Sequence, residues 1–346
     1  MTTLIDCLSL DRLHALLARV PNLRIGVIGD ICLDAYWTVD MTRARLSRET
    51  PHFARPVVAE VYGPGAGANV AQNLAAAGVD RVAVFSVTGA DLWGERLHSE
   101  LSGHGKGSLL AGIDTAGICA VSGRRTNAYI KPLLTGYHSQ QEDSRLDFEN
   151  TAPLDPAVEA DLLARLETAL PGLDALIIAD QLEQYGVVTP RIRARLNQLA
   201  EQLPEKIFLA DSRMRIREYS HMIIKPNELE ATAAVAEASL SDAGKTLSRA
   251  SGRPVWLTLG ENGVLVCTPI DAVQIPAAPV RPPLDIVGAG DAFLAWLAAG
   301  LAAGAAPAEA GALANLAAAV TVEKLNQTGT ATPEEILERY RLCEQS

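Results

Sequence analysis

The sequence is poor in aromatic residues and carries no excess of positive charge, and each shortage argues against a class of protein. Aromatic residues make up 5% of the 346 residues, which disfavours a pocket that stacks on a nucleobase. The net charge is −11, whereas a nucleic-acid-binding protein usually presents a basic face. We therefore expect no nucleic-acid partner, although a few local Arg and Lys residues can still hold an anionic substrate.

Cysteines and long apolar runs are also scarce. The five cysteines are odd in number, lie far apart and form no C-x-x-C pair, so neither a disulfide framework nor a thiolate zinc site is expected. The N-terminus lacks the basic segment and apolar core of a signal peptide. The most apolar run, 292–306, is too short for a membrane helix of ~20 residues and is predicted to be a buried helix. We expect a cytoplasmic protein without a membrane partner.

Several familiar site motifs are missing as well. The six histidines form no H-x-x-x-H pair, and no Ser-His-Asp nucleophile motif occurs. GPGAGANV (63–70) resembles a dinucleotide-binding fingerprint, but Val70 stands where its last glycine should be. AGKT (243–246) resembles the end of a phosphate-binding P-loop, but Ser239 replaces the required glycine. Both mismatches argue against those nucleotide sites.

Short apolar runs alternate with helical patterns along most of the chain. Runs such as LRIGVIGD (23–30), ALIIAD (175–180) and KIFLAD (206–211) are typical of buried parallel strands. This alternation predicts a Rossmann-like α/β fold, with a mostly parallel sheet and helices on both faces. Ligands of such sheets bind beyond the carboxyl ends of the strands. The sequence places these polar residues there: Asp30, Asp34, Asp180, Asp211, Asn227 and Glu230.

Two segments, 36–62 and 116–134, mix β-forming residues with scattered charges and have no helical period. We expect them to form a small β-lid inserted into one domain that spans residues 1–346. Their low apolar content cannot build a separate core, and unpaired strand edges favour a partner, so we expect a homodimer formed through the lid. The basic lid residues are either solvated or candidates for binding a substrate phosphate: Arg43, Arg45, Arg48, Arg124, Arg125 and Lys131.

The stretch DIVGAGDAFLAWLAAG (285–300) combines a glycine-rich turn with the start of an apolar helix. Gly288 and Gly290 allow backbone N–H groups to converge, and the helix dipole adds positive potential, so this point favours an anion. A carboxylate there would repel phosphate unless Asp291 faces a hydroxyl that attacks the phosphate and passes its proton to Asp291. The alternative is that Asp291 merely caps the helix, and the motif alone leaves both interpretations open.

Four elements of the sequence resemble, in order, the signatures of the ribokinase-like (phosphofructokinase-B family) carbohydrate kinases. They are GPGAGANVAQNLAAAG (63–78), KPNELEA (225–231), LTLGENGVLV (257–266) and DIVGAGDAF (285–293). The resemblance spans roughly residues 23–340. VIGDICLDAYW (27–37) and SRLDFE (144–149) are most similar to the kinase half of the bifunctional heptose 7-phosphate kinase/ADP-heptose synthase. The chain has no H-x-G-H nucleotidyltransferase motif, so the resemblance implies a kinase acting alone.

This resemblance implies that the γ-phosphate of ATP is transferred to a hydroxyl of a sugar or sugar phosphate, with Mg²⁺ and, in some members, potassium. Asp291 would be the general base, beside the amides of Gly288, Ala289 and Gly290. The implied sugar-binding residues are Asp34, Gly65, Ala66, Gly67, Asn69 and Glu183. On the nucleotide side, the resemblance implies Asn227, Thr258, Gly260, Gly263 and Asn315 for ATP, Asn227 and Glu230 for Mg²⁺ through water, and Asp285 for a monovalent cation.

The sequence departs from the family pattern at two places. Ile286 replaces the threonine of D-T-x-G-A-G-D, and IADQLEQYG (178–186) lacks the Asp-Tyr-x-Lys-Gly stretch of heptose kinases. QLE resembles ribokinase-type members instead, in which the glutamate contacts the substrate. The identity of the sugar and its phosphorylation state therefore stay open.

Other interpretations remain beside the sugar kinase. One is a nucleoside kinase of the same fold, which the few aromatic residues disfavour, and another is a non-catalytic sugar or nucleotide sensor, which has no need of a general base. At single positions, the glycines can be ordinary turns. Asn227 and Glu230 can be the N-cap and third residue of a helix. Asp211 and Arg213 can be a structural ion pair or can lie near the triphosphate.

Overall fold

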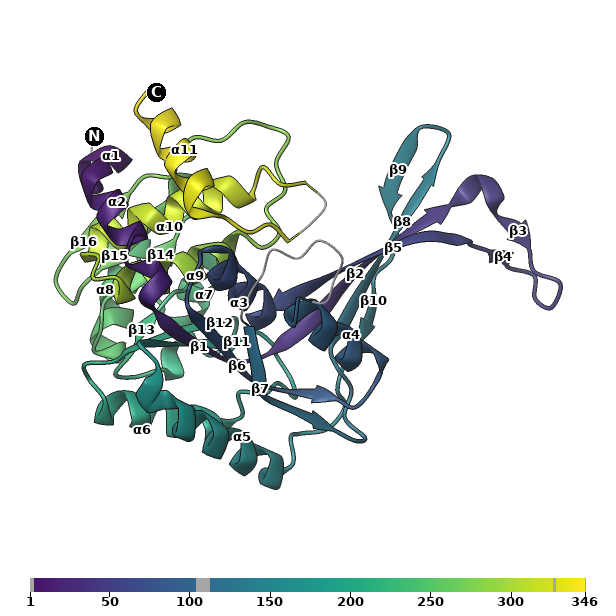
Figure 1. Ribbon diagram of the computed structural model, residues 1–346, viewed down its shortest axis with the longest axis horizontal. Helices are drawn as coiled ribbons and strands as arrows, with labels where there is room; N and C mark the ends of the chain where they lie inside the picture. The colour runs from purple at the N-terminus through teal and green to yellow at the C-terminus, as the bar shows by residue number, and fades with distance from the viewer. Residues whose placement is uncertain (1–2, 104–112, 326–327, 346) are drawn as a thin grey trace.

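The computed structural model describes residues 3–103, 113–325 and 328–345. A nine-stranded sheet forms its centre and has the strand order β16-β15-β14-β13-β12-β11-β1-β6-β7 (Figure 1). Strands β7 to β14 of this order run parallel, and β15 and β16 are antiparallel at one edge. The strands are β1 (Arg24–Gly29), β6 (Arg81–Gly89), β7 (Ile113–Val121), β11 (Ala175–Asp180), β12 (Ile207–Ser212), β13 (Ile223–Ile224), β14 (Val255–Thr258), β15 (Val264–Cys267) and β16 (Ala272–Ile275).

Helices cover both faces of this sheet, so its central strands are buried on both sides, as their apolar runs predict. Side chains alternate between the two cores: Ile177 of β11 belongs to one, and Leu176 and Ile178 to the other. The first core contains α1 (Leu4–Cys7), α2 (Leu10–Leu17), α3 (Gly67–Ala76), α4 (Leu92–Leu101), α9 (Ala289–Ala302), α10 (Pro307–Thr321) and α11 (Pro333–Cys343). The second contains α5 (Pro156–Ala169), α6 (Pro190–Gln202), α7 (Glu228–Ala234) and α8 (Leu240–Ser251).

The predicted α/β class is therefore confirmed. The buried helix expected over 292–306 is largely α9, which is buried from Ala292 to Gly300 and ends at Ala302. Within the described ranges, no helix is both long enough and apolar enough to span a bilayer.

A second, smaller sheet has the order β10-β8-β2-β5, with β9 added on β8. It extends away from the body, and the short β3–β4 hairpin lies at its far end (Figure 1). We call it the lid. Its strands are β2 (Ile31–Asp40), β5 (Val57–Ala66), β8 (Ala128–Gly136), β9 (Ser139–Glu142) and β10 (Leu146–Phe148), and the hairpin strands are β3 (Arg45–Leu46) and β4 (Phe53–Ala54).

The lid differs from the expected boundaries. The segment 36–62 lies within it, but residues 116–121 belong to β7, which pairs in parallel with β6 in the large sheet. The prediction that 116–134 is lid throughout is wrong there, because Ile118 and Cys119 are buried and extend the parallel ladder. The lid sheet is mixed: β2 pairs antiparallel with β5 but parallel with β8.

Gly29 makes the junction between the large sheet and the lid possible. Its φ of 135° lies where only glycine is comfortable, and a Cβ there would collide with the backbone oxygen of Ala179. β1 ends at Gly29 and β2 begins at Ile31, so the chain passes between the two sheets through Asp30 alone.

We predict that Gly29→Ala lowers the free energy of unfolding by about 2 kcal/mol or more, because it adds both a strained φ and a steric clash. Urea unfolding measures this change. Gly172→Ala is the matched control, since a Cβ there meets nothing within 4 Å, and it should leave stability within about 0.5 kcal/mol. Equal effects of the two substitutions would contradict the steric argument.

Candidate active site

A cleft of about 580 Å³ opens where the carboxyl ends of the strands face the base of the lid. Its walls come from the junction of β1 and β2, from β8, from the residues on either side of β10, from the segment after β11, and from the start of α9. Such an edge is where α/β sheets bind ligands. Four predicted site residues line it together: Asp34, Ala66, Glu183 and Asp291.

Asp291 is the third residue of α9, whose N-cap, Gly288, has a left-handed φ of 83°. The Asp291 carboxylate accepts a hydrogen bond from Asn69 Nδ2 at 2.8 Å. A Cβ on Gly288 would lie 2.9 Å from that same nitrogen, so the glycine leaves Asn69 room to reach the acid. The N-cap Gly288 makes no side-chain hydrogen bond, and the hydrogen bond that Asp291 accepts comes from Asn69 of α3, which favours the catalytic interpretation over the capping one.

The environment of Asp291 favours its protonated form. Burial raises its pKa from 3.8 to about 7, and the negative charges of Asp211 and Asp34 act in the same direction. The hydrogen bond from Asn69 and the charge of Lys225 oppose the rise. A carboxyl group with a pKa near neutrality can take up and release a proton at physiological pH, which suits a general base.

Asp34 lies on β2 in a different setting. It is buried, and its Oδ1 is 3.3 Å from Nζ of Lys131. Lys131 also donates to the Tyr36 hydroxyl at 3.1 Å, so this lid cation is held by its neighbours rather than solvated. A Cβ on Gly65 would lie 2.6 Å from Asp34 Oδ2. Gly65 thus contributes space for the carboxylate.

The other predicted sugar-side residues surround the start of α3. Ala66 has a positive φ of 53° and is the N-cap of α3. Gly67 N donates to the backbone oxygen of Asp30 at 2.9 Å, and a Cβ on Gly67 would lie 2.8 Å from it. Asn69 is fully buried, and Asn73 Nδ2 contacts its Oδ1 at 3.3 Å, which directs the Asn69 NH₂ group toward Asp291.

The predicted metal-side residues form a helix start. Asn227 caps α7, and Asn227 and Glu230 exchange two hydrogen bonds of 2.8 Å between side chain and backbone. Burial and the charge of Asp211 raise the pKa of Glu230. Asp211 lies 3.4 Å from Nζ of the buried Lys225. Asp211 therefore forms a structural ion pair, but its partner is Lys225 and not the expected Arg213. Arg213 lines the cleft instead.

The remaining nucleotide-side predictions lie outside the cleft lining. Thr258 forms an isolated parallel β-bridge with Asn227, and the Thr258 N–H donates to Pro226 O at 2.9 Å. Gly260 faces open space, whereas Gly263 fills a tight left-handed turn against Ile275. Asn315 Nδ2 donates to Pro276 O at 2.9 Å, and Asp285 Oδ1 accepts from Val287 N at 3.0 Å.

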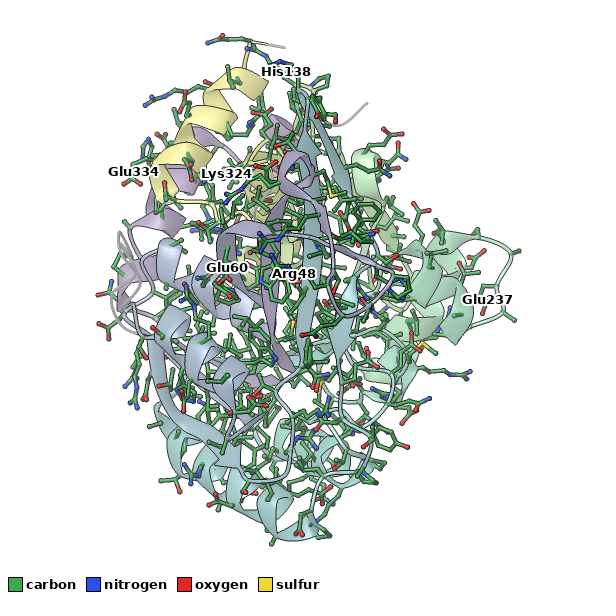
Figure 2. The ribbon with its side chains drawn as sticks, turned by 90° about the vertical axis from the view of Figure 1, so that its right-hand side faces the viewer. Arg48, Glu60, His138, Glu237, Lys324 and Glu334 are labelled. Atoms are coloured by element: carbon green, nitrogen blue, oxygen red, sulfur yellow. The ribbon has the colours of Figure 1, made fainter. Side chains whose placement is uncertain are left out.

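Lid residues that the sequence did not single out for the sugar side also line the cleft. Tyr129 of β8 carries the guanidinium of Arg145 over its ring, 4.8 Å from the centroid. Arg145 is paired with Asp147 at 2.6 and 2.7 Å. Tyr129 lies in the predicted lid segment 116–134 and Arg145 in the quoted stretch SRLDFE (144–149), but neither pattern indicated that the two side chains meet. Three of the basic residues named as phosphate-binding candidates are exposed and do not line the cleft: Arg43, Arg45 and Arg48. Figure 2 labels Arg48.

We predict that Asp291→Asn stabilises the fold by about 1–2 kcal/mol at pH 8, because one pKa unit corresponds to about 1.4 kcal/mol and the side chain is only half-buried. The folded-state pKa of about 7 lies above the ordinary 3.8. The charge therefore penalises the folded state increasingly from pH 3.8 to 7, and fully above pH 7. Urea unfolding at pH 8 and pH 4.5 should show the advantage of the variant shrinking at the lower pH. An advantage that is independent of pH would contradict the burial argument.

Comparison with known proteins agrees with this geometry. Residues 24–335 match the family model described as pfkB family carbohydrate kinase. The chain is 34% identical over 333 residues to the bifunctional protein HldE of Trichlorobacter lovleyi, which covers 94% of this chain and 64% of that protein. HldE of Geobacter metallireducens is 31% identical with the same coverage. The chain thus spans just under two thirds of the length of these relatives.

Solved structures show the same fold at low identity. Phosphofructokinase-2 from Escherichia coli, in a tetrameric inhibited form, gives a TM-score of 0.70 at 19% identity, covering 93% of this chain and 99% of that one. Ribokinase from Thermotoga maritima gives 0.66 at 21% identity, with coverage of 92% and 99%. The resemblance drawn from the four sequence elements is confirmed by the family match. The chain belongs to the pfkB family of carbohydrate kinases.

Proposed function

We propose that the protein transfers the γ-phosphate of ATP to a hydroxyl of a sugar or sugar phosphate, with Asp291 as the general base. The observation that carries the proposal is the setting of Asp291. It lines the cleft at the N-terminal end of α9, has a pKa of about 7, and is held by Asn69 instead of by a cation. A carboxylate that only stabilises a helix start requires none of these features.

The proposed reaction assigns different work to the two carboxylates of the cleft. Asp34 accepts hydrogen bonds from sugar hydroxyls, and its contact with Lys131 Nζ at 3.3 Å holds the side chain in place. The attacking hydroxyl forms a bond to the γ-phosphorus and gives its proton to Asp291, while the bond from that phosphorus to the bridging oxygen of ADP breaks. The amides at Gly288, Ala289 and Gly290, with the dipole of α9, stabilise the charge on the transferred group.

Kinases of this family use ATP with Mg²⁺, and the residues present fit that ion. Within the described residues, no three His, Cys, Asp or Glu side chains cluster closely enough to form a protein cage for a metal. Mg²⁺ keeps several waters and takes few protein oxygens beside the phosphates. Glu230 and Asn227 would hold it through water, and when bound it neutralises charge on the phosphates. Asp285, in the turn before α9, would lie beside a monovalent cation such as potassium.

The cleft favours a sugar over a nucleoside as acceptor. The carboxylates of Asp34 and Glu183 are suited to accept hydrogen bonds from hydroxyl groups. A nucleobase would stack on an aromatic ring, and of the two tyrosines in the lining, Tyr129 and Tyr185, the first already carries the Arg145 guanidinium over its ring. A thermal-shift screen of sugars and sugar phosphates with Mg²⁺ and a non-hydrolysable ATP analogue would identify the acceptor, because a ligand at 100 times its Kd adds about 2.7 kcal/mol of stability.

We predict that Asp291→Asn lowers turnover by a factor on the order of 10²–10⁴, the usual contribution of a general base. ATP affinity should be equal or slightly higher, since a negative charge near the γ-phosphate is removed. Steady-state kinetics with the best acceptor measures the first quantity, and calorimetry measures the second.

Asp242→Asn is the matched control for this experiment. Asp242 is likewise the third residue of a helix, α8, but it accepts a hydrogen bond from Ser239 at the surface. Its substitution should leave turnover unchanged. Near-normal turnover of the Asp291 variant would remove the general base from the proposal.

We also propose that the lid mediates a homodimer. β5 lies at the edge of the lid sheet, so one side of its backbone has no neighbouring strand in that sheet. Val58 and Val61 of this strand are 46% and 56% exposed. Unpaired edges with exposed apolar side chains favour association, and a second copy of the same edge is complementary to the first.

Light scattering at micromolar concentration should give about twice the 36.7 kDa of one chain. Val61→Lys should shift the protein toward monomer, because it places a charge in the apolar contact. Ile270→Lys is the control: that residue is 89% exposed on the turn between β15 and β16, so its substitution should change nothing. A wild-type protein that is only monomeric would count against the dimer.

A further inference from the structure

The segment 181–187, which joins β11 to α6, forms one wall of the cleft. We call it the acceptor loop. Its first five residues all line the cleft, and Glu183 is among them. The loop forms no helix or strand, and Tyr185 within it has a positive φ of 54°. Its shape therefore depends on contacts from other parts of the chain.

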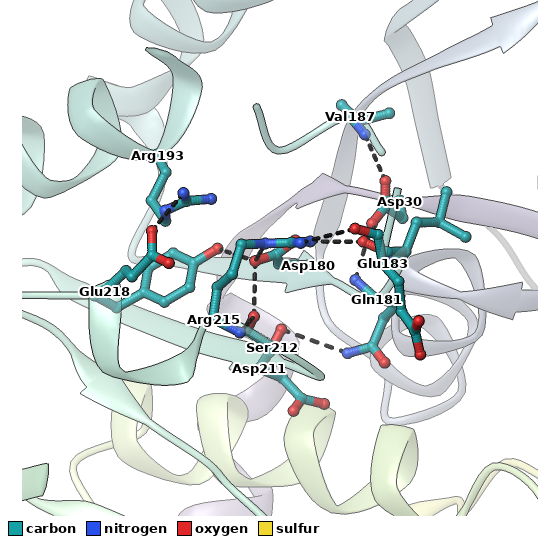
Figure 3. A network of polar contacts seen from close by, with 12 residues as sticks. Asp30, Asp180, Gln181, Glu183, Val187, Arg193, Asp211, Ser212, Arg215 and Glu218 are labelled. Carbon is teal, nitrogen blue, oxygen red and sulfur yellow. Dashed lines mark hydrogen bonds and ion pairs between the residues drawn. The ribbon is translucent and has the colours of Figure 1, made fainter. Parts of the chain in front are cut away.

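One buried carboxylate closes this loop. Asp30, which is 1% exposed between β1 and β2, accepts three backbone hydrogen bonds from it (Figure 3). Oδ2 accepts from Gln181 N at 2.9 Å and from Leu182 N at 2.8 Å, and Oδ1 accepts from Val187 N at 2.6 Å. Asp30 thus binds both ends of the loop, and hydrogen bonds to a buried charge are among the strong ones.

Gly186 shows that the loop is fitted to this carboxylate. A Cβ at Gly186 would lie 2.9 and 3.1 Å from the two Asp30 oxygens. A side chain there would push the loop away from Asp30. The position of the glycine is therefore a second observation, independent of the hydrogen bonds, that points to close contact between Asp30 and the loop.

A second buried carboxylate holds the carbonyl groups of the loop through an arginine. Arg215 pairs with Asp180 at 2.5 and 3.1 Å and donates to Leu182 O at 2.6 Å and Glu183 O at 3.1 Å (Figure 3). Asp180 is itself fixed by two hydroxyl donors: Ser212 and Tyr219. From the lid side, Arg124 donates to Tyr185 O at 2.8 Å.

We infer that Asp30 is a positioning residue for the sugar acceptor: it holds the acceptor loop in a preformed shape that directs Glu183 into the cleft. The inference rests on the proposed kinase function. Asp30 takes no direct part in the proposed reaction, because both of its carboxylate oxygens accept hydrogen bonds from amides of the loop. A fixed wall lowers the entropy lost when the acceptor binds, so the acceptor, not the nucleotide, should be sensitive to Asp30.

Asp30→Asn tests this inference at pH 8, where the acid is ionised because its pKa, raised by burial and lowered by the three amides, is about 6. Asn keeps the shape but offers one acceptor oxygen in place of two and removes the charge. We expect the KM for the acceptor to rise about tenfold, the effect of losing one hydrogen bond to a charged group. The KM for ATP should stay within about twofold.

Asp174→Asn is the matched control. Asp174 also accepts a backbone hydrogen bond, from Arg24 N at 2.7 Å. It lies at the start of β1 and β11, whereas Asp30 lies at the end of these strands. Its substitution should change neither KM. A coupled variant separates positioning from general stability: if Asp30 acts by placing Glu183, then Glu183→Gln should raise the acceptor KM less in the Asp30→Asn background than in the wild type.

The outcomes are distinguishable. A wild-type protein that phosphorylates no acceptor contradicts the proposed function. An active wild type whose Asp30→Asn variant keeps its acceptor KM, loses affinity for both substrates equally, or shows additive effects with Glu183→Gln overturns the inference alone. If Asp30→Asn fails to fold, Arg215→Lys decides the matter. It keeps the charge beside Asp180 but cannot reach both loop carbonyls, so an unchanged acceptor KM would overturn the inference.

Discussion

Three carboxylates buried at the ends of adjacent parallel strands determine how the site above the sheet is built. Asp30, Asp180 and Asp211 terminate or follow β1, β11 and β12, and none is more than 6% exposed. A buried charge is tolerated only when it is paired or hydrogen-bonded. Asp30 is satisfied by loop amides, Asp180 by Arg215 and two hydroxyls, and Asp211 by Lys225. The partners of Asp30 and Asp180 fix the acceptor loop, which forms one wall of the cleft.

Asp291 differs from Asp34 because a neutral side-chain amide, not a cation, contacts it. Asp34, in the same cleft, has Lys131 at 3.3 Å. Two carboxylates with such different partners are suited to different roles: the first can change its protonation near neutral pH, and the second suits the hydrogen-bond acceptor that we propose for the substrate. The difference is produced by single side chains, Asn69 on α3 and Lys131 on β8.

The sequence predicted most of the fold, because buried parallel strands have continuous apolar runs and the glycine motifs are local. The boundary of the lid was missed at 116–121, where β-forming residues with a mixed pattern occur both in a lid and in an edge strand such as β7. Asp30 and Asp180 were recognised as strand-end acids, but their shared loop was not. Partners such as Asp30 and Val187 are 157 residues apart, and such contacts leave no local pattern. The contact between Arg145 and the ring of Tyr129 was missed for the same reason, because it depends on the pairing of β10 with β8.

The lid strands join the body directly at the cleft, so a movement of the far end of the lid pivots about the cleft. β2 starts one residue after Asp30, and β5 runs into α3 without a linker. With a rise of about 3.3 Å per residue, Asp34 lies about 10 Å along β2 and its far end about 30 Å. A sideways displacement of about 3 Å at the tip therefore moves Asp34 by about 1 Å, the scale of misplacement that can change a reaction rate a hundredfold. A contact at the far end of the lid is therefore transmitted, reduced about threefold, to Asp34 in the cleft.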